Sequence, residues 1–321
     1  MKKKIIAIVI PAYKVKQQIT EVVSTIPKFI DFIYVIDDYC PENSGDLVLK
    51  EINDNRVKVI KHEVNRGVGA AVISGYRAAV KDSVDIVVKI DGDGQMDPSL
   101  IIDFITPIIN EKADYCKGNR FFNLETIRAM PNIRIIGNAI LSFLNKLSSG
   151  YWNLFDPTNG FTAINAELIN YLPLDKISQR YFFESDMLFR LNTLRAVVFD
   201  IPMNAKYEDE KSNLKIRDIL FEFLFKHLIN FVKRIFYNYY LRDMSLASIQ
   251  LPIGILLFLF GFIFGLNKWI IASSLQVATS AGTVMLSALT ILAGMQLIFA
   301  FLNYDISSIP SQPWPRKRSG K

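Results

Sequence analysis

One stretch decides the fold class: Asp85-Ile86-Val87-Val88-Lys89-Ile90-Asp91-Gly92-Asp93-Gly94-Gln95. Its β-branched run is typical of a strand that is buried on both faces of a parallel sheet. Side chains two positions apart share a face, so Asp91 and Asp93 can converge where the strand ends. Two such carboxylates repel each other unless a cation joins them, and they suit Mg²⁺ or Mn²⁺ that also holds a diphosphate. An ordinary Asp-Gly turn between strand and helix explains the same residues.

Apolar strands alternate with helical patterns through the N-terminal third of the chain. The expected strands are Ile5 to Ile10, Phe32 to Ile36, Val57 to Ile60 and Ile86 to Ile90, and the expected helices are Gln17 to Ile26, Ser44 to Ile52 and Gly69 to Lys81. This alternation predicts a doubly wound α/β sheet whose ligands lie at the carboxyl ends of the strands. No GxGxxG follows the first strand and no GxxxxGK[ST] occurs, which disfavours a Rossmann dinucleotide site and a P-loop.

The composition excludes some classes of protein. The 321 residues carry a net charge of +6, but 50% of them are hydrophobic, which does not fit a typical nucleic-acid binder. Cys40 and Cys116 form no metal-site or disulfide pattern and fit a reducing cytosol. The apolar run after Met1 is too short before Pro11 for a signal peptide, so it is predicted to be the first core strand.

Two uncharged segments near the C-terminus predict membrane spans. They cover about residues 249–266 and 283–302, each long enough for one hydrocarbon core; a buried helical hairpin in a soluble core is the alternative. Basic residues flank the pair on both outer sides, whereas the connecting loop has only Lys268. The N-terminal domain and the C-terminal tail are therefore expected in the cytoplasm. The flanking residues are Lys226, Lys233, Arg234 and Arg242 before the spans, and Arg316, Lys317, Arg318 and Lys321 after them.

The segment 214–243 links the soluble domain to the spans. Asp218, Glu222, Lys226 and Asn230 form one polar stripe within a wide apolar face, which suits a helix lying in the bilayer interface. An amphipathic helix packed on the soluble domain explains the same pattern. The expected parts of the chain are a soluble domain, this juxtamembrane helix, a transmembrane hairpin and a basic tail, at residues 1–213, 214–243, 244–305 and 306–321.

Four motifs fall in order along the soluble domain and together resemble one family. They are Ile8-Val9-Ile10-Pro11-Ala12-Tyr13, Val35-Ile36-Asp37-Asp38, Asn65-Arg66-Gly67-Val68-Gly69-Ala70 and Asp91-Gly92-Asp93-Gly94-Gln95. The set resembles the family 2 glycosyltransferases, which have the GT-A nucleotide-sugar fold. Lys117-Gly118-Asn119-Arg120 and Asn159-Gly160-Phe161 are similar to two further segments of that family. With the two spans, the chain looks like the polyprenyl-phosphate hexosyltransferases, such as dolichol-phosphate mannose synthases.

The resemblance implies a donor site for a UDP- or GDP-hexose. In the family the paired aspartates and a nearby glutamine hold the metal, Mg²⁺ or Mn²⁺, and Asp91, Asp93 and Gln95 match them. Asp37 and Asp38 match the acidic pair beside the nucleobase and ribose. The remaining donor-side matches are Pro11, Tyr13, Asn65 and Gly67. The family usually continues Pro-x-Tyr-Asn-Glu, and this chain instead has Lys14-Val15 after Tyr13.

The resemblance also implies an acceptor site for a lipid phosphate. Arg120, Arg134 and Asn138 follow the order of the two arginines and the small polar residue that grip the phosphate in dolichol-phosphate synthases. Arginine suits this task because its planar fork binds phosphate oxygens bidentately. A solvated helix face is the alternative for Arg134. Lys211 lies in a divergent version of the basic loop that covers the donor phosphates, and a solvated charge run before a helix explains it equally well.

Glu184 and Asp186 lie where many family 2 enzymes carry a catalytic base. A sugar hydroxyl needs a base before it attacks an anomeric carbon, and Asp186 would then be preferred. A phosphate acceptor is already largely ionised at neutral pH and needs none. An N-cap for the following helix is the plain alternative for Asp186.

The reaction implied is an inverting, metal-dependent transfer of a hexose to a membrane polyprenyl phosphate, with Asp93, Arg120, Arg134 and Asp186 as the candidate catalytic residues. Transfer to a sugar hydroxyl of a lipid-linked or cell-wall glycan is the nearest rival, and an inactive nucleotide-sugar-binding module is another. The exposed helix surface of a two-span hairpin could also pack against further copies of the chain.

Overall fold

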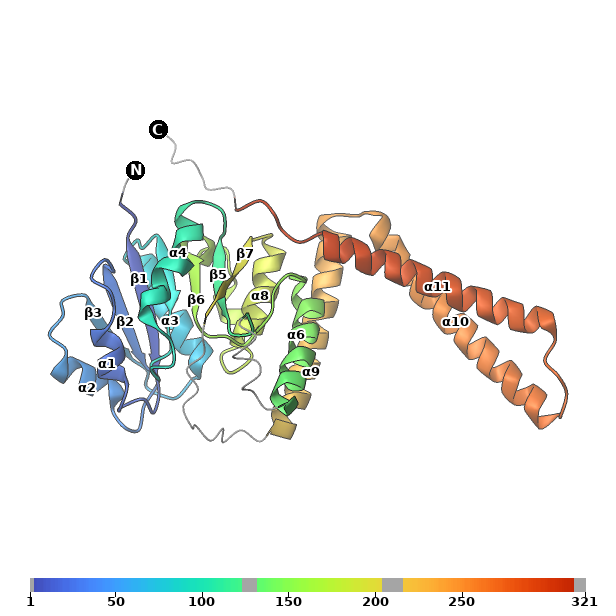
Figure 1. The fold of residues 1–321 in the computed structure, drawn as a ribbon, viewed down its shortest axis with the longest axis horizontal. Helices are drawn as coiled ribbons and strands as arrows, with labels where there is room; N and C mark the ends of the chain where they lie inside the picture. Colours follow the sequence, from blue (N-terminus) through green and yellow to red (C-terminus); the bar gives the residue numbers. More distant parts are fainter. Residues whose placement is uncertain (1–2, 123–131, 204–215, 315–321) are drawn as a thin grey trace. The chain divides into compact units, whose positions relative to one another are not determined.

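A computed structural model describes residues 3–122, 132–203 and 216–314 of the chain (Figure 1). Its contacts divide the chain into two compact units. The first unit contains residues 1–231 and 310–321, and the hairpin unit contains residues 232–309. The described residues 310–314 therefore group with the first unit and not with the hairpin.

The first unit is built on a seven-stranded sheet with the order β3-β2-β1-β4-β6-β5-β7. All neighbours pair in parallel except β6, which runs antiparallel to both β4 and β5. The predicted mostly parallel, doubly wound α/β sheet is confirmed, and its first four strands lie where the sequence predicts them. The strands are β1 (Ile6–Ala12), β2 (Phe32–Asp37), β3 (Val57–Lys61), β4 (Ile86–Lys89), β5 (Tyr115–Asn119), β6 (Thr162–Asn165) and β7 (Val198–Pro202).

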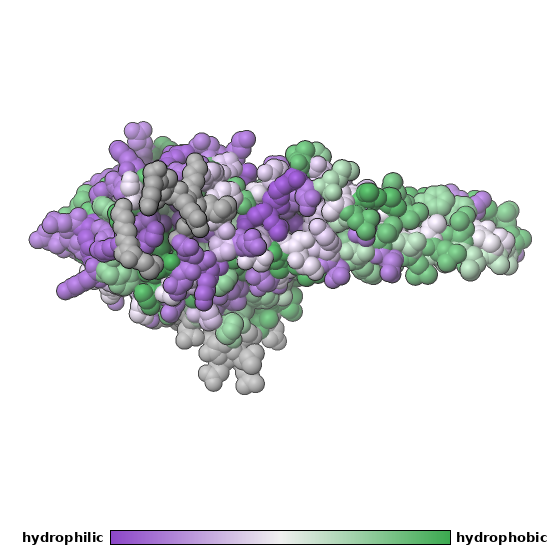
Figure 2. Space-filling view, turned by 90° about the horizontal axis from the view of Figure 1, so that it is seen from above, coloured by the Kyte–Doolittle hydropathy of each residue, from purple (hydrophilic) through white to green (hydrophobic). Residues whose placement is uncertain are grey.

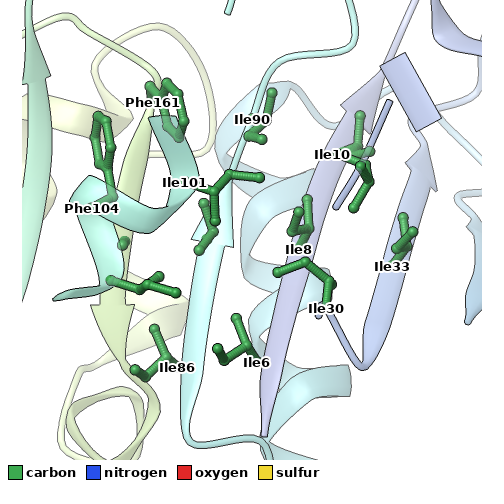
Figure 3. Close-up of a cluster of buried hydrophobic side chains, with 14 of the residues drawn as sticks. Ile6, Ile8, Ile10, Ile30, Ile33, Ile86, Ile90, Ile101, Phe104 and Phe161 are labelled. Atoms are coloured by element: carbon green, nitrogen blue, oxygen red, sulfur yellow. The ribbon is translucent and has the colours of Figure 1, made fainter. Parts of the chain in front are cut away.

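Helices cover both faces of this sheet (Figure 1). On one face, side chains of α1 and α4 join those of β1 and β4 in a continuous apolar core, part of which Figure 3 shows. Phe104 of α4 stacks on Phe161, which precedes β6, with ring centroids 3.9 Å apart. The helical segments of this unit are α1 (Ile19–Ser24), α2 (Ser44–Glu51), α3 (Val68–Lys81), η1 (Pro98–Leu100), α4 (Ile101–Ile109), α6 (Asn132–Ser149), α7 (Ala166–Ile169), η2 (Leu174–Lys176) and α8 (Phe183–Thr193).

On the opposite face, α3 packs closely on β1. A Cβ at Gly75 of α3 would lie 2.3 Å from a methyl carbon of Val9, so only glycine permits this approach. Val9 is the register partner of Lys89 in the parallel pairing of β1 with β4. The side chain of Lys89 therefore also lies on the face that α3 covers, among buried residues.

Helix α9 (Ile216–Phe236) occupies the predicted amphipathic segment and continues into a π-helical turn, η3 (Tyr237–Arg242). Some of its polar side chains face the first unit: Asn230 donates to Asp186 (2.9 Å), and His227 Nδ1 lies 2.7 Å from Ser148 Oγ. The outward side is apolar, with more than half of Phe221 and of Phe225 exposed. The helix thus packs on the domain through Asn230, His227 and the buried Phe223, whereas Glu222 of the predicted polar stripe is exposed. Its role as an interfacial helix stays a prediction.

The hairpin unit consists mainly of α10 (Leu246–Ser274) and α11 (Ala281–Ser307). Both helices have the length and hydropathy needed to cross a membrane, and each contains one of the two predicted spans. Hydrophobic residues dominate their surfaces in Figure 2. A Cβ at Gly294 of α11 would lie 2.5 Å from the backbone nitrogen of Phe258, and one at Gly261 would lie 2.4 Å from Thr290 Oγ1. Small residues therefore set the spacing of the helices, as is typical of membrane helix pairs.

Replacing Gly294 by leucine is expected to destabilise the helix pair by roughly 1–3 kcal/mol, because the new side chain must push the facing backbone away. Thermal unfolding of the purified protein in detergent would measure the change. Gly282 is the matched control, since a Cβ there has no neighbour within 4 Å. Gly282→Leu should leave the unfolding temperature nearly unchanged, and an equal loss in both variants would contradict close packing at Gly294.

Residues after α11 return to the first unit. The backbone N–H of Trp314 donates to a carboxylate oxygen of Asp114 (2.9 Å), and its ring lies 5.2 Å from that of Tyr171. Asp114 is buried and also accepts from the N–H of Val197 (2.8 Å) at the start of β7. The last described residues are therefore held by specific contacts at the amino-terminal edge of β5 and β7.

Candidate active site

The carboxyl ends of β1, β2, β4 and β5 meet at one edge of the sheet, because these strands share one direction. Since β6 runs antiparallel to them, its amino end and the preceding turn at Gly160 lie at the same edge. The topology therefore gathers residues from five predicted motifs at one place. Within the first unit, it brings Asp91 close to the Asn159-Gly160-Phe161 turn.

Asp37 is the last residue of β2 and Asp38 follows it, and both carboxylates are buried. The carboxylate of Asp37 accepts from the backbone N–H groups of Cys40 (2.7 Å) and Gly45 (2.8 Å), which fixes the loop that leads into α2. Both oxygens of the Asp37 carboxylate thus accept hydrogen bonds from the backbone of this loop. Asp37 shapes the loop at which the nucleotide side of the site is predicted.

The carboxylate of Asp38 organises the loop before α3. It accepts from the N–H groups of Arg66 (2.9 Å) and Gly67 (2.7 Å), and Asn65 Nδ2 donates to the Asp38 carbonyl oxygen (3.1 Å). The His62 ring lies 2.7 Å from the same carboxylate. Gly67 has a φ of +96°, a conformation that favours glycine. The structure therefore brings Asp38, Asn65 and Gly67 together, with the two buried carboxylates acting as loop anchors.

Pro11 and Tyr13 lie where β1 ends. Pro11 is buried, and 43% of Tyr13 is exposed at the sheet edge. Lys14 has a φ of +58° and its N–H donates to Cys40 Sγ (3.1 Å), so the chain turns sharply after Tyr13. The divergence at Lys14 from the family pattern thus coincides with a left-handed turn held by Cys40.

Asp91 follows β4 and forms an ion pair that the sequence analysis did not predict. Lys89 Nζ lies 2.9 Å from Asp91 Oδ1 and 3.1 Å from Glu184 Oε1 of α8. Burial lowers the pKa of Lys89, but the two carboxylates more than reverse this and raise it above its ordinary value. Burial raises the pKa of Glu184, Lys89 opposes this and Asp91 adds to it, and the net change is an increase. Glu184 thus lies beside the first aspartate of the pair.

Asp93 and Gln95 lie in the loop after Asp91. The N–H of Gln95 donates to Asp93 Oδ1 (3.1 Å), which closes a tight turn, and both side chains are partly exposed. Within residues 3–122, 132–203 and 216–314, no group of three or more His, Cys, Asp or Glu side chains is arranged to hold a metal. Mg²⁺ is commonly held by one or two carboxylates together with substrate phosphates and water. The oxygen donors of this loop fit such a shared site and do not fit an all-protein cage.

Asp186 is held by hydrogen bonds from two other segments of the chain. Its buried carboxylate accepts from the Ser178 N–H (2.9 Å) and from Asn230 Nδ2 (2.9 Å) of α9, and Arg190 Nε lies 3.7 Å away. The residue therefore ties α8 to α9 and to the segment before α8. These contacts are those of a structural anchor, and a catalytic role for Asp186 stays a prediction.

Arg120 follows β5 and forms a bidentate ion pair with Asp156. Arg120 Nε and a terminal nitrogen lie 2.7 and 2.6 Å from the two carboxylate oxygens. Burial raises the pKa of Asp156, but the hydrogen bonds and charge of Arg120 outweigh this and hold the pKa below its usual value. A phosphate bound by Arg120 would share the guanidinium with this carboxylate.

The remaining candidates are Arg134 and Asn138 on the acceptor side and Lys211 on the donor side. Asn138 lies on α6 and is partly exposed. Arg134 belongs to the first turn of the same helix, one turn before Asn138, but its side chain lies outside the described residues. Lys211 also lies outside them. The backbone thus places Arg134 and Asn138 on one helix face.

The sequence of this domain matches a known family. Residues 7–172, more than half of the chain, match the model described as "Glycosyl transferase family 2". The chain belongs to glycosyltransferase family 2. The resemblance of its strand-end motifs to that family is confirmed, and the chain is identified as an enzyme of that class.

Several curated relatives of this glycosyltransferase are named for polyprenyl-phosphate acceptors. A UDP-N-acetylglucosamine–dolichyl-phosphate N-acetylglucosaminyltransferase of Methanococcus voltae is 31% identical over 224 residues, which cover 65% of this chain and 88% of that protein. An undecaprenyl-phosphate mannosyltransferase of Micrococcus luteus is 28% identical, covering 53% of this chain and 70% of that protein. A dolichol-phosphate mannosyltransferase of Pyrococcus furiosus is 26% identical, and the alignment covers 71% of this chain and 64% of that protein.

Solved structures agree on the fold. Glucosyl-3-phosphoglycerate synthase of Mycobacterium tuberculosis, in complex with Mn²⁺, UDP and glucosyl-3-phosphoglycerate, superposes with a TM-score of 0.52. The alignment covers 72% of this glycosyltransferase and 80% of that chain at 18% sequence identity. At this identity the match shows a shared GT-A-like fold alone.

The structural role of Asp186 in this glycosyltransferase can be tested by Asp186→Asn. Asparagine can keep only one of the two short hydrogen bonds without rearrangement, so we expect a loss of about 1–3 kcal/mol in stability. Chemical unfolding followed by circular dichroism would measure it. The turnover number at a temperature where the variant stays folded should remain within a few-fold of the wild-type value. A loss of activity without a loss of stability would instead assign Asp186 to the chemistry.

Proposed function

We propose that this glycosyltransferase transfers a hexose, with inversion, from a nucleotide-diphosphate sugar to a membrane polyprenyl phosphate. The observation that carries the proposal is the union in one chain of a family 2 domain with two helices of membrane-spanning length. The acceptors named for the relatives supply the substrate class. The basic flanks of the two spans favour a cytoplasmic position for both termini.

The donor binds at the carboxyl edge of the sheet in this proposal. Asp91, Asp93 and Gln95 would hold the divalent metal together with the diphosphate, and a bound metal would supply positive charge against the negative charge of the leaving group. The loop that Asp38 orders, with Asn65 and Gly67, borders the nucleotide together with Tyr13. The backbone N–H groups and side chains of this edge orient the donor so that its anomeric carbon faces the acceptor.

The acceptor phosphate binds on the side of β5 and α6. Arg120 and Arg134 would supply the positive charge, with Asn138 one helical turn from Arg134. A phosphate oxygen attacks the anomeric carbon, the bond from that carbon to the diphosphate oxygen breaks, and the electron pair leaves with the nucleoside diphosphate. The attacking oxygen is already ionised at neutral pH, so no side chain has to remove a proton.

Transfer to a sugar hydroxyl is the second candidate, and one observation favours it. Glu184 is a carboxylate at the donor site that shares the Lys89 ammonium with Asp91, whereas Asp186 is hydrogen-bonded to Ser178 and Asn230. A hydroxyl acceptor would need such a base. Glu184, and not Asp186, is therefore the residue to which this alternative would assign the proton transfer.

A donor screen tests the proposal. Full-length protein in detergent is mixed with radiolabelled UDP-glucose, UDP-galactose, UDP-N-acetylglucosamine or GDP-mannose, with Mn²⁺ or Mg²⁺, and with one acceptor: undecaprenyl phosphate, dolichyl phosphate, or a lipid-linked glycan that carries free hydroxyls. We expect butanol-extractable label from one donor, dependent on both the lipid phosphate and the metal. Label transferred only to a glycan carrying free hydroxyls would favour the second candidate, and no transfer from any donor would contradict both.

A further inference from the structure

Lys89 is a charged side chain in the middle of the sheet. It is only 1% exposed, and it pairs across the strands with Val9 of β1 and Thr162 of β6. A buried ammonium group is costly unless opposite charges compensate it. Lys89 therefore needs a specific arrangement of anions around it.

Two carboxylates from separate elements provide this arrangement. Asp91 follows the same strand, and Glu184 belongs to the first turn of α8. One ammonium thus ties the loop that carries Asp91 to a helix more than ninety residues further along the chain. One positive charge faces two negative charges, so the three side chains together carry a net charge of −1.

The two carboxylate oxygens of Asp91 have different neighbours. Oδ1 is bound to Lys89, while Oδ2 faces Gly160 across the sheet edge. A Cβ at Gly160 would lie 2.3 Å from Oδ2 and 2.5 Å from Lys89 Nζ, so the turn before β6 closes directly over the pair. Lys89 and the turn at Gly160 therefore both restrict the position of Asp91.

We propose that Lys89 is a positioning residue that orients Asp91 and weakens the intrinsic affinity of the Asp91–Asp93 loop for a divalent cation. This inference rests on the proposed donor site. Oδ1 of Asp91 is bound to Lys89, but the Asp91 side chain is still 29% exposed, so Oδ2 is the oxygen left for the cation. The nearby ammonium repels the cation. Tight metal binding then requires the donor diphosphate, whose charge compensates both cations, so metal and donor bind together.

The two partners of the ion pair predict shifts of opposite sign. Lys89→Met removes a positive charge next to the cation site, and Mn²⁺ should bind about tenfold more tightly in the absence of nucleotide. Glu184→Gln removes a negative charge with little change in shape, and Mn²⁺ should bind about tenfold more weakly. A merely structural role for Lys89 does not predict opposite shifts.

Mn²⁺ binding to the full-length protein in detergent, followed by electron paramagnetic resonance of the free ion, measures these affinities without turnover. Lys117→Met is the matched control, because Lys117 of β5 is also only 1% exposed. Its Nζ forms an ion pair with Asp200 Oδ1 of the neighbouring strand β7 (3.0 Å). We expect Lys117→Met to lower the unfolding temperature and to leave the Mn²⁺ affinity unchanged.

The inference is overturned if Lys89→Met binds Mn²⁺ as the wild type does, or if Lys117→Met shifts the affinity equally. If Lys89→Met does not fold, the Glu184→Gln variant decides alone: weaker Mn²⁺ binding supports the inference, and unchanged binding overturns it. These results are independent of the donor screen. A wild-type protein that transfers no sugar contradicts the proposed function, whereas unshifted Mn²⁺ affinities in an active enzyme contradict only the role of Lys89.

Discussion

Asp93→Asn is expected to lower the rate of sugar transfer by about 100-fold or more, the loss typical of removing a group that stabilises charge in a transition state. Asp93 lies in the turn after β4, where its Oδ1 already accepts from the N–H of Gln95. Asparagine can keep this hydrogen bond through its amide oxygen, so the loop should hold its shape. What is lost is the negative charge that Asp93 would offer to a metal in the proposed donor site.

The measurement is nucleoside diphosphate release with saturating donor and polyprenyl phosphate. The matched control is Asp97→Asn, four residues further on, where Oδ1 accepts from the N–H of Ser99 at the start of η1. That change also removes one negative charge from the same loop region, but it should reduce the rate less than threefold, as for a surface substitution. Full activity of Asp93→Asn at ordinary metal concentration would remove Asp93 from the site.

The sheet and the location of its chemistry could be predicted from the sequence because both depend on local patterns. Runs such as Ile86 to Ile90 are short and β-branched, and each is followed by a turn with polar residues. In a mostly parallel sheet these turns must collect at one edge. The prediction that these polar turns share one edge needed no knowledge of side-chain contacts. The antiparallel strand β6, which brings the turn at Gly160 beside Asp91, was not predicted.

The partners of the buried charges could not be predicted in this way. Asp156 binds Arg120 across 36 residues, and Asp186 binds Asn230 across 44. Such pairs depend on how strands and helices pack, and no local pattern records them. An aspartate at a helix start looks the same in sequence whether it serves as a base or as an anchor. Lys89 did offer a signal, since a lysine within an apolar strand needs a buried counter-charge.

In the hairpin, too, the local pattern could be predicted from the sequence and the long-range partner could not. Its length and lack of charge predict two spans, and the structure contains two helices at those positions. The only acidic residue in α11 is Asp305, in its last turn. Its partner, Arg234, lies 71 residues earlier, in the last turn of α9. A charge in this position is costly unless it is paired, so the pair is the feature of the hairpin unit most sensitive to substitution.

Asp305→Leu is therefore expected to destabilise the hairpin unit by about 3–5 kcal/mol, the usual cost of leaving a buried charge without its partner. Arg234 places its two terminal nitrogens 2.6 and 3.0 Å from the carboxylate oxygens of Asp305, and Tyr239 donates to the same carboxylate (2.5 Å). Both members of the ion pair are almost fully buried. Arg234→Met should cost a similar amount, because Asp305 would then be the uncompensated charge.

The double variant Arg234→Met with Asp305→Leu separates the interaction from the cost of each change. Replacing a buried ion pair by apolar side chains of similar volume is often close to neutral, so the double variant should recover most of the stability lost by either single variant. Reversible unfolding in detergent micelles would supply the four free energies, and Lys233→Met, at an exposed neighbouring position, is the control. If the two single losses simply add, Arg234 and Asp305 do not stabilise each other, and the hairpin is held to α9 by apolar packing alone.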